Sequence, residues 1–141
     1  MNEPFPMLQP VVALVLWSMV MWGWMYATRI PAIQRARMKL DSDAPRGEQM
    51  SQLPPAVRWK ADNYNHLMEQ PTIFYAAALA LAVAGDTTTV SVALAWAYVG
   101  TRVLHSFVQS LGNIILMRFG VFFVSSLILL ALSIRAALIV F

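Results

Sequence analysis

The chain has no cysteine among its 141 residues, and only 12% of those residues are charged. The absence of cysteine excludes disulfide bonds, thiolate metal sites and a cysteine nucleophile. A thiol that takes part in any reaction here must therefore come with the substrate. The two histidines, His66 and His105, fall on different predicted helices without a carboxylate triad, a pattern that predicts no metal site.

The scarcity of charge goes with long apolar runs, and 59% of the residues are hydrophobic. A helix that crosses a bilayer needs about 20 mostly apolar residues. We therefore predict an all-α integral membrane protein, one domain over residues 1–141, with four transmembrane helices in an up-down bundle. The predicted spans are residues 7–28, 64–84, 89–109 and 119–140, and residues 29–61 form the first loop.

Basic residues gather in this first loop. It holds seven of the ten lysines and arginines, namely Arg29, Arg35, Arg37, Lys39, Arg46, Arg58 and Lys60. Loops rich in Lys and Arg stay in the cytoplasm, so we expect the loop to be cytoplasmic and both termini, with Glu3 near the first, to lie on the opposite side. Because these charges border apolar segments, they favour contact with lipid headgroups over nucleic-acid binding.

A polar cluster opens the second predicted helix. Asp62, Asn65, Glu69 and Thr72 recur at a spacing of three, four and three residues, which places them on one face of a helix. A glutamate inside a membrane helix is costly unless it faces protein or water, so it marks a candidate functional site. Pro71 is expected to kink or loosen the helix beside this cluster.

A second polar stripe, Arg102, His105, Gln109 and Asn113, follows helical spacing on the third predicted helix. Glu69 and Arg102 lie at almost equal distances from the turn at Asp86, so their depths agree. We therefore predict an ion pair between them inside the bundle, because opposite charges offset each other's desolvation. Such a pair joins helices more often than it binds a ligand, and His105 is likewise interpreted first as a packing residue.

The two stripes together predict a pocket that opens toward the loop side. Three further cations, Arg29, Lys60 and Arg118, come to the same level. The pocket is then cationic at its polar end and apolar toward the lipid. It suits a molecule with an anionic part next to an apolar one.

In order and spacing these residues resemble the MAPEG superfamily, membrane-associated proteins in eicosanoid and glutathione metabolism. The family's second helix carries an asparagine, an acidic residue about a turn later, a proline and an aromatic-rich run, which here are Asn65, Glu69, Pro71 and Phe74. Its third helix carries an arginine followed by a histidine or an aromatic residue, which here are Arg102 and His105. The resemblance covers nearly the whole chain and is to a divergent bacterial-type branch.

The resemblance implies a homotrimer of four-helix subunits. For a bacterial-type member we expect the inner membrane, where the distribution of basic residues makes both termini periplasmic. The resemblance also implies that glutathione binds between neighbouring subunits near the cytoplasmic face. An arginine at the start of the fourth helix stabilises the thiolate in the family, and Arg118 matches that position. The candidate residues that bind substrate or glutathione are Asn65, Glu69, Arg102, His105, Gln109, Arg29 and Lys60.

Three functions follow from these observations. The first is a glutathione-dependent transferase or peroxidase that acts on lipophilic electrophiles, with Arg118 as the catalytic cation. The alternative is a non-catalytic lipid-binding or scaffold protein of the same fold. The third is a small multidrug-type transporter, which ranks last because such proteins carry their glutamate in the first helix and the first span here has no charge. Expected partners are other copies of the chain, membrane lipids and a lipophilic small molecule.

Overall fold

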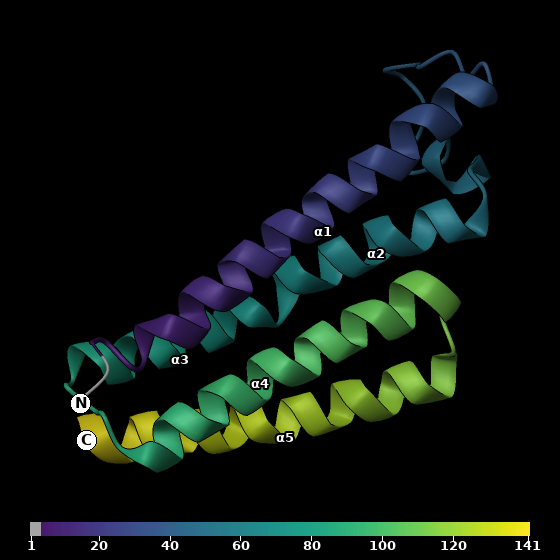
Figure 1. Cartoon of the computed structure of the whole chain (residues 1–141). Helices are drawn as coiled ribbons and strands as arrows, with labels where there is room; N and C mark the ends of the chain where they lie inside the picture. The colour runs from purple at the N-terminus through teal and green to yellow at the C-terminus, as the bar shows by residue number, and fades with distance from the viewer. Residues whose placement is uncertain (1–3) are drawn as a thin grey trace.

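The computed structural model describes residues 4–141, so Glu3 lies outside the described residues. The helices are α1 (Leu8–Arg35), α2 (Pro55–Glu69), α3 (Pro71–Val83), α4 (Thr89–Phe107) and α5 (Ile115–Val140), with a short 3₁₀ turn (Met50–Gln52) and a π-helical segment (Val108–Gly112). No strand occurs within the described range. As Figure 1 shows, α2 and α3 follow one another along one line and run antiparallel to α1, while α4 and α5 form a second antiparallel pair.

Two helices, α1 and α5, are long and apolar enough to cross a membrane. The first helix continues to Arg35, well past the predicted end of its span at residue 28, and α2 already begins at Pro55. The expected loop of residues 29–61 is therefore partly helical. Apolar composition marks the part of a helix that suits lipid, but the backbone hydrogen bonds of a helix continue beyond that part into the polar boundary region.

The helical line formed by α2 and α3 is interrupted between Glu69 and Pro71, as expected from the prediction that Pro71 kinks or loosens the helix there. Proline has no N–H to donate, and its ring opposes the carbonyl one turn earlier. The side chain of Gln70 fills the break. Its Nε2 donates to the hydroxyl of Ser126 on α5 at 2.8 Å, and its Oε1 accepts from the hydroxyl of Tyr98 on α4 at 3.1 Å. The break is thus tied to both neighbouring helices.

The apolar core lies on the α3 side of this break. Phe74 and Tyr98 stack with ring centroids 4.6 Å apart, and Leu14, Leu81 and Leu132 pack around them with no exposed surface. The outward faces of α1 and α5 also carry many large apolar side chains, which are exposed on the single chain. An apolar core inside and an apolar exterior outside are what a bundle surrounded by lipid requires.

A polar cluster lies at the far end of α3, where the turn between α3 and α4 meets α5. Asp86 accepts a hydrogen bond from the backbone N–H of Thr88 at 2.9 Å, and the side chain of Thr88 caps α4. Arg135 donates to the hydroxyls of Ser91 at 2.7 Å and Thr88 at 2.9 Å and lies 3.9 Å from the carboxylate of Asp86. Burial raises the pKa of Asp86, but the polar groups of Ser91 and Thr88 and the charge of Arg135 together outweigh it and lower that pKa.

Replacing Arg135 is expected to loosen this end of the bundle. The Arg135→Gln variant should unfold about 3 °C or more below the wild type at pH 7, because it loses charge-assisted hydrogen bonds. A carboxyl whose folded pKa is lowered stabilises the fold above its ordinary pKa, 3.8 for Asp86, and this contribution disappears as the pH falls toward the folded pKa. The melting-temperature difference between wild type and variant should therefore narrow below about pH 4.

Thermal unfolding in detergent over a pH series measures both effects. An Arg135→Lys variant, which keeps the charge but not the guanidinium geometry, serves as the matched control and should fall between the two. Equal melting temperatures at pH 7, or a difference that does not change with pH, would contradict the assignment.

Candidate functional site

A polar pocket of about 300 Å³ lies between α2, the π-helical segment and the start of α5. Its lining side chains are Asp62, Asn65, His66, Glu69, Gln109 and Arg118. We call it the α2–α5 pocket. Four of the predicted site residues meet here, namely Asn65, Glu69, Gln109 and Arg118. Asp62, Asn65 and Glu69 line the pocket from one face of α2, as their helical spacing indicates. The polar face of α2 therefore meets one member of the second polar stripe, Gln109, whereas Arg102, His105 and Asn113 do not line the pocket.

The end of the π-helical segment positions Arg118. Asn113 has a φ of 46°, in the left-handed region, and its N–H closes the segment by bonding to the carbonyl of Val108 at 2.8 Å. Asparagine is one of the few residues that adopts this conformation at little cost. Its Oδ1 accepts from Nη1 of Arg118 at 2.7 Å. The turn that separates α4 from α5 thus also holds the guanidinium beside the pocket.

Gln109 offers the pocket an acceptor without a partner. The residue is buried, and its Oε1 has no hydrogen-bond partner within the described part of the chain. A buried carbonyl oxygen left unpaired costs about 1–3 kcal/mol. The side chain lines the pocket, so Gln109 contributes an amide group to its inner wall.

The predicted ion pair between Glu69 and Arg102 is wrong. Glu69 is exposed, and its carboxylate lies 3.7 Å from Nδ1 of His66. Arg102 has no exposed surface, and its Nη2 donates to the backbone carbonyl of His66 at 3.2 Å. Glu69 and Arg102 do lie at the same depth, since Arg102 contacts the carbonyl of His66, within one helical turn of Glu69. Counting residues from the turn gives the level along a helix but not the direction in which each side chain points, and the carboxylate points to the pocket face instead.

Arg102 and His105 form a buried layer behind the pocket. The guanidinium of Arg102 lies 5.8 Å from the ring of Phe122, and the ring of His105 lies 5.6 Å from that of His66. Neither residue lines the α2–α5 pocket. His66 belongs to both groups, because it lines the pocket and contacts the buried layer. Within residues 4–141, no three His, Cys, Asp or Glu side chains gather as a set that could hold a metal ion.

Lys60 is buried and acts as a connection between segments. Its Nζ donates to the carbonyls of Ala56 at 2.8 Å and Ser110 at 3.2 Å, and it lies 5.1 Å from the ring of Trp24. Burial lowers the pKa of its ammonium group. The lysine joins α1, α2 and the π-helical segment, and it lines neither pocket described here.

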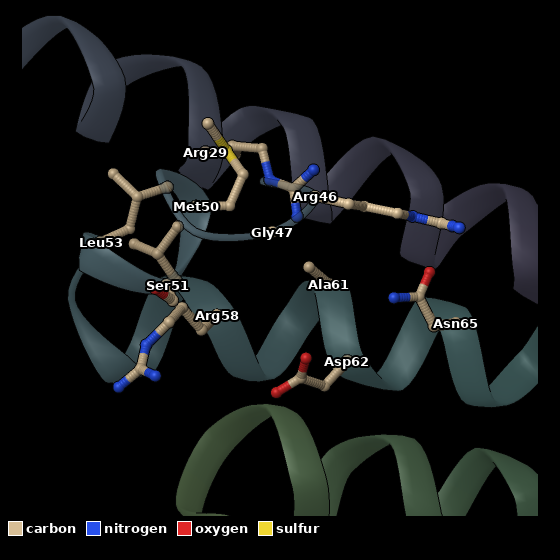
Figure 2. A pocket seen from close by; sticks show the side chains of 11 residues that line it. Arg29, Arg46, Gly47, Met50, Ser51, Leu53, Arg58, Ala61, Asp62 and Asn65 are labelled. Carbon is tan, nitrogen blue, oxygen red and sulfur yellow. The ribbon is translucent and has the colours of Figure 1, made fainter. Parts of the chain in front are cut away.

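Arg29 lines a second pocket, of about 390 Å³, between α1, the loop and the first turns of α2. Figure 2 shows this pocket, with Asp62 and Asn65 along its α2 wall. These two residues therefore lie at the edge of both pockets. The structure separates Arg29 from Arg118, although the sequence placed both at one level.

Sequence reasoning missed the π-helical segment and the part that Asn113 plays in it. The segment follows directly on from α4 and shows no period of its own. The only signal was Gly112-Asn113, a pair that favours a helix end because both residues accept a left-handed conformation. Segments of this kind are frequent at functional sites.

Comparison with known proteins gives one match. A sequence model of the MAPEG family matches residues 7–138, which is nearly the whole chain. No curated protein and no solved structure matches. The matched range includes every residue of the α2–α5 pocket.

Two substitutions of Asn113 test the role of its backbone conformation. In Asn113→Ala the left-handed φ costs about 1–2 kcal/mol, so this variant should unfold several degrees below the wild type. In Asn113→Gly the same φ is freely available, so the melting temperature should stay closer to that of the wild type. Thermal unfolding in detergent measures the order. An alanine variant as stable as the glycine variant would show that this turn does not depend on the left-handed conformation.

Proposed function

The chain belongs to the MAPEG family, and from this we propose that it is a membrane-bound, glutathione-dependent transferase or peroxidase acting on lipophilic electrophiles. The family match confirms the resemblance seen in the sequence. The observation that carries the proposal is that Arg118 shares one pocket with Asn65, Glu69 and Gln109. Glutathione is the proposed co-substrate, and Arg118 the residue that stabilises its thiolate.

The groups around the pocket suit a tripeptide of this kind. Glutathione carries an ammonium group, two carboxylates, two peptide units and a thiol. The carboxylates of Asp62 and Glu69 are suited to an ammonium group, and the amides of Asn65 and Gln109 to peptide units. Because the chain has no cysteine, the thiol must come from the co-substrate.

Arg118 supplies the one guanidinium of this pocket. A neighbouring positive charge favours the ionised form of a thiol and so lowers its pKa. The thiolate then attacks an electrophilic carbon, a C–S bond forms, and the leaving group departs with its electron pair. Arg118 lies in the first turn of α5, which also presents Leu116 and Phe119 outward as exposed apolar side chains. An electrophile dissolved in the bilayer therefore has a short path to the guanidinium.

We also propose a homotrimer with the site near its subunit boundaries. Asp62, Asn65 and Glu69 are exposed on the single chain, so a neighbouring subunit is available to close the pocket over a bound ligand. The loop side is proposed to face the cytoplasm of a bacterial cell, because seven of the ten basic residues lie at residues 29–61.

Removing Arg118 should remove thiolate formation. Wild-type protein mixed with glutathione should give the ultraviolet absorbance of a thiolate and conjugate a chlorodinitrobenzene-type electrophile. Arg118→Ala should lose both by about tenfold or more, since one pKa unit changes the thiolate fraction up to tenfold. The matched control is Arg35→Ala, which removes an exposed cation at the end of α1 that does not line the pocket and should keep both signals.

Two results would overturn the proposal. One is the absence of both signals in the wild type, and the other is an Arg118→Ala variant that behaves like the wild type. The first would favour the non-catalytic lipid-binding or scaffold protein of the same fold. The second would show that a group other than Arg118 activates the thiol.

A further inference from the structure

The second pocket carries cations that lie outside the α2–α5 pocket, among them Arg29, which the sequence predicted as a glutathione-binding residue. Three arginines line it, Arg29 from α1, Arg46 from the loop and Arg58 from α2, against one carboxylate, that of Asp62. Figure 2 shows Arg29 and Arg46 between α1 and α2, with the guanidinium of Arg58 turned away from them toward the start of α2. Neither Arg118 nor Gln109 belongs to this pocket, so it is chemically distinct from the α2–α5 pocket.

None of the three arginines has a partner within residues 4–141. The ion pairs in this part of the chain are His66 with Glu69 and Arg135 with Asp86, and no hydrogen bond involves the three guanidinium groups. The Nε of Arg29 is moreover buried without an acceptor. Buried N–H groups in folded proteins are nearly always hydrogen-bonded. No acceptor for this group lies within residues 4–141, so the group is left to water or to a ligand.

The length of α1 favours a position of this pocket near lipid headgroups. From Leu8 to Arg29 the helix rises about 31 Å at 1.5 Å per residue, close to the roughly 30 Å of a hydrocarbon core. With Leu8 at one boundary of the hydrocarbon core, this rise brings Arg29 to the other boundary, where phosphate groups begin. The wall next to the arginines includes Met50 and Leu53, which offer apolar contact beside the charge.

We infer that this pocket binds a phosphate group, carried by an anionic phospholipid headgroup or by a free phosphate compound at the membrane surface. The planar fork of a guanidinium matches phosphate oxygens in a bidentate manner, and the excess of cations over carboxylates favours an anion. The inference goes beyond the proposed glutathione chemistry and does not depend on it.

Occupancy of the pocket has a structural consequence for the loop. The turns around Arg46 are held by local contacts, such as the hydrogen bonds of the Gln49 side chain with Lys39 and Asp41. Arg46 is exposed, whereas Arg29 is fixed on α1. A phosphate held by both side chains connects the loop to the helix. The loop-side wall of the pocket is then stabilised by its own ligand.

The test measures thermal unfolding of the full-length protein in neutral detergent with three probes. These are short-chain phosphatidylglycerol, a diacylglycerol with the same acyl chains but no phosphate, and inorganic phosphate, all at constant ionic strength. A ligand that binds only the folded state raises the melting temperature, and the rise grows with the logarithm of its concentration above the dissociation constant. The variants are Arg46→Ala and, as the matched control, Lys39→Ala, which removes a cation from the same loop outside the pocket. Arg46 is exposed, so both variants should unfold at the wild-type temperature without ligand.

Phosphatidylglycerol should stabilise the wild type more than diacylglycerol does. Its affinity should fall by about tenfold in Arg46→Ala, the loss of one charge-assisted hydrogen bond, and remain unchanged in Lys39→Ala. The same pattern with inorganic phosphate alone, and no added effect of the lipid, would support a free phosphate compound as the ligand. Equal losses in the two variants, equal stabilisation by diacylglycerol, or no stabilisation by any probe would overturn the inference.

Discussion

Arg102, buried on α4, and Pro71, at the junction of α2 and α3, together determine where the α2–α5 pocket lies. Pro71 ends the regular backbone of α2, because it cannot donate to the carbonyl of Leu67. Within a turn of this break, Arg102 donates from α4 to the carbonyl of His66. The contact fixes His66 between the buried layer and the solvent-facing polar residues of α2. This hydrogen bond, together with that from Lys60 to Ser110, positions the pocket-lining face of α2 against α4 and the π-helical segment.

The sequence predicted the depth of a residue along its helix better than the direction in which its side chain points. Apolar runs, the position of Pro71 and the repeat of polar residues on α2 correctly gave an all-helical chain, a break and a shared face. The pairing of Glu69 with Arg102 failed, because a small difference in rotation about a helix axis moves a carboxylate from one neighbour to another. No count of residues along a helix contains that rotation.

The π-helical segment and the course of residues 36–54 could not be predicted, for a different reason. The π-helical segment changes the number of residues per turn, so positions beyond Gln109 no longer follow the stripe that begins at Arg102. The course of residues 36–54 depends on many weak contacts in a segment without period, and it is this course that separates Arg29 from Arg118. Residue spacing had placed Arg118 at the level of the pocket together with Arg29 and Lys60, and the family resemblance singled it out as the catalytic candidate.

The break at Pro71 also separates α2 from α3, so that the two helices are held by different contacts. On one side α3 is held in the core by Phe74 and Leu81, and on the other α2 carries the residues that line both pockets. Helices bend most readily where the backbone ladder is interrupted. The position of α2 therefore rests on side-chain contacts to its neighbours, namely those of Gln70 with α4 and α5, of Arg102 with His66, and of Lys60 with the π-helical segment. Because α2 is a wall of both pockets, the same contacts determine the width of each.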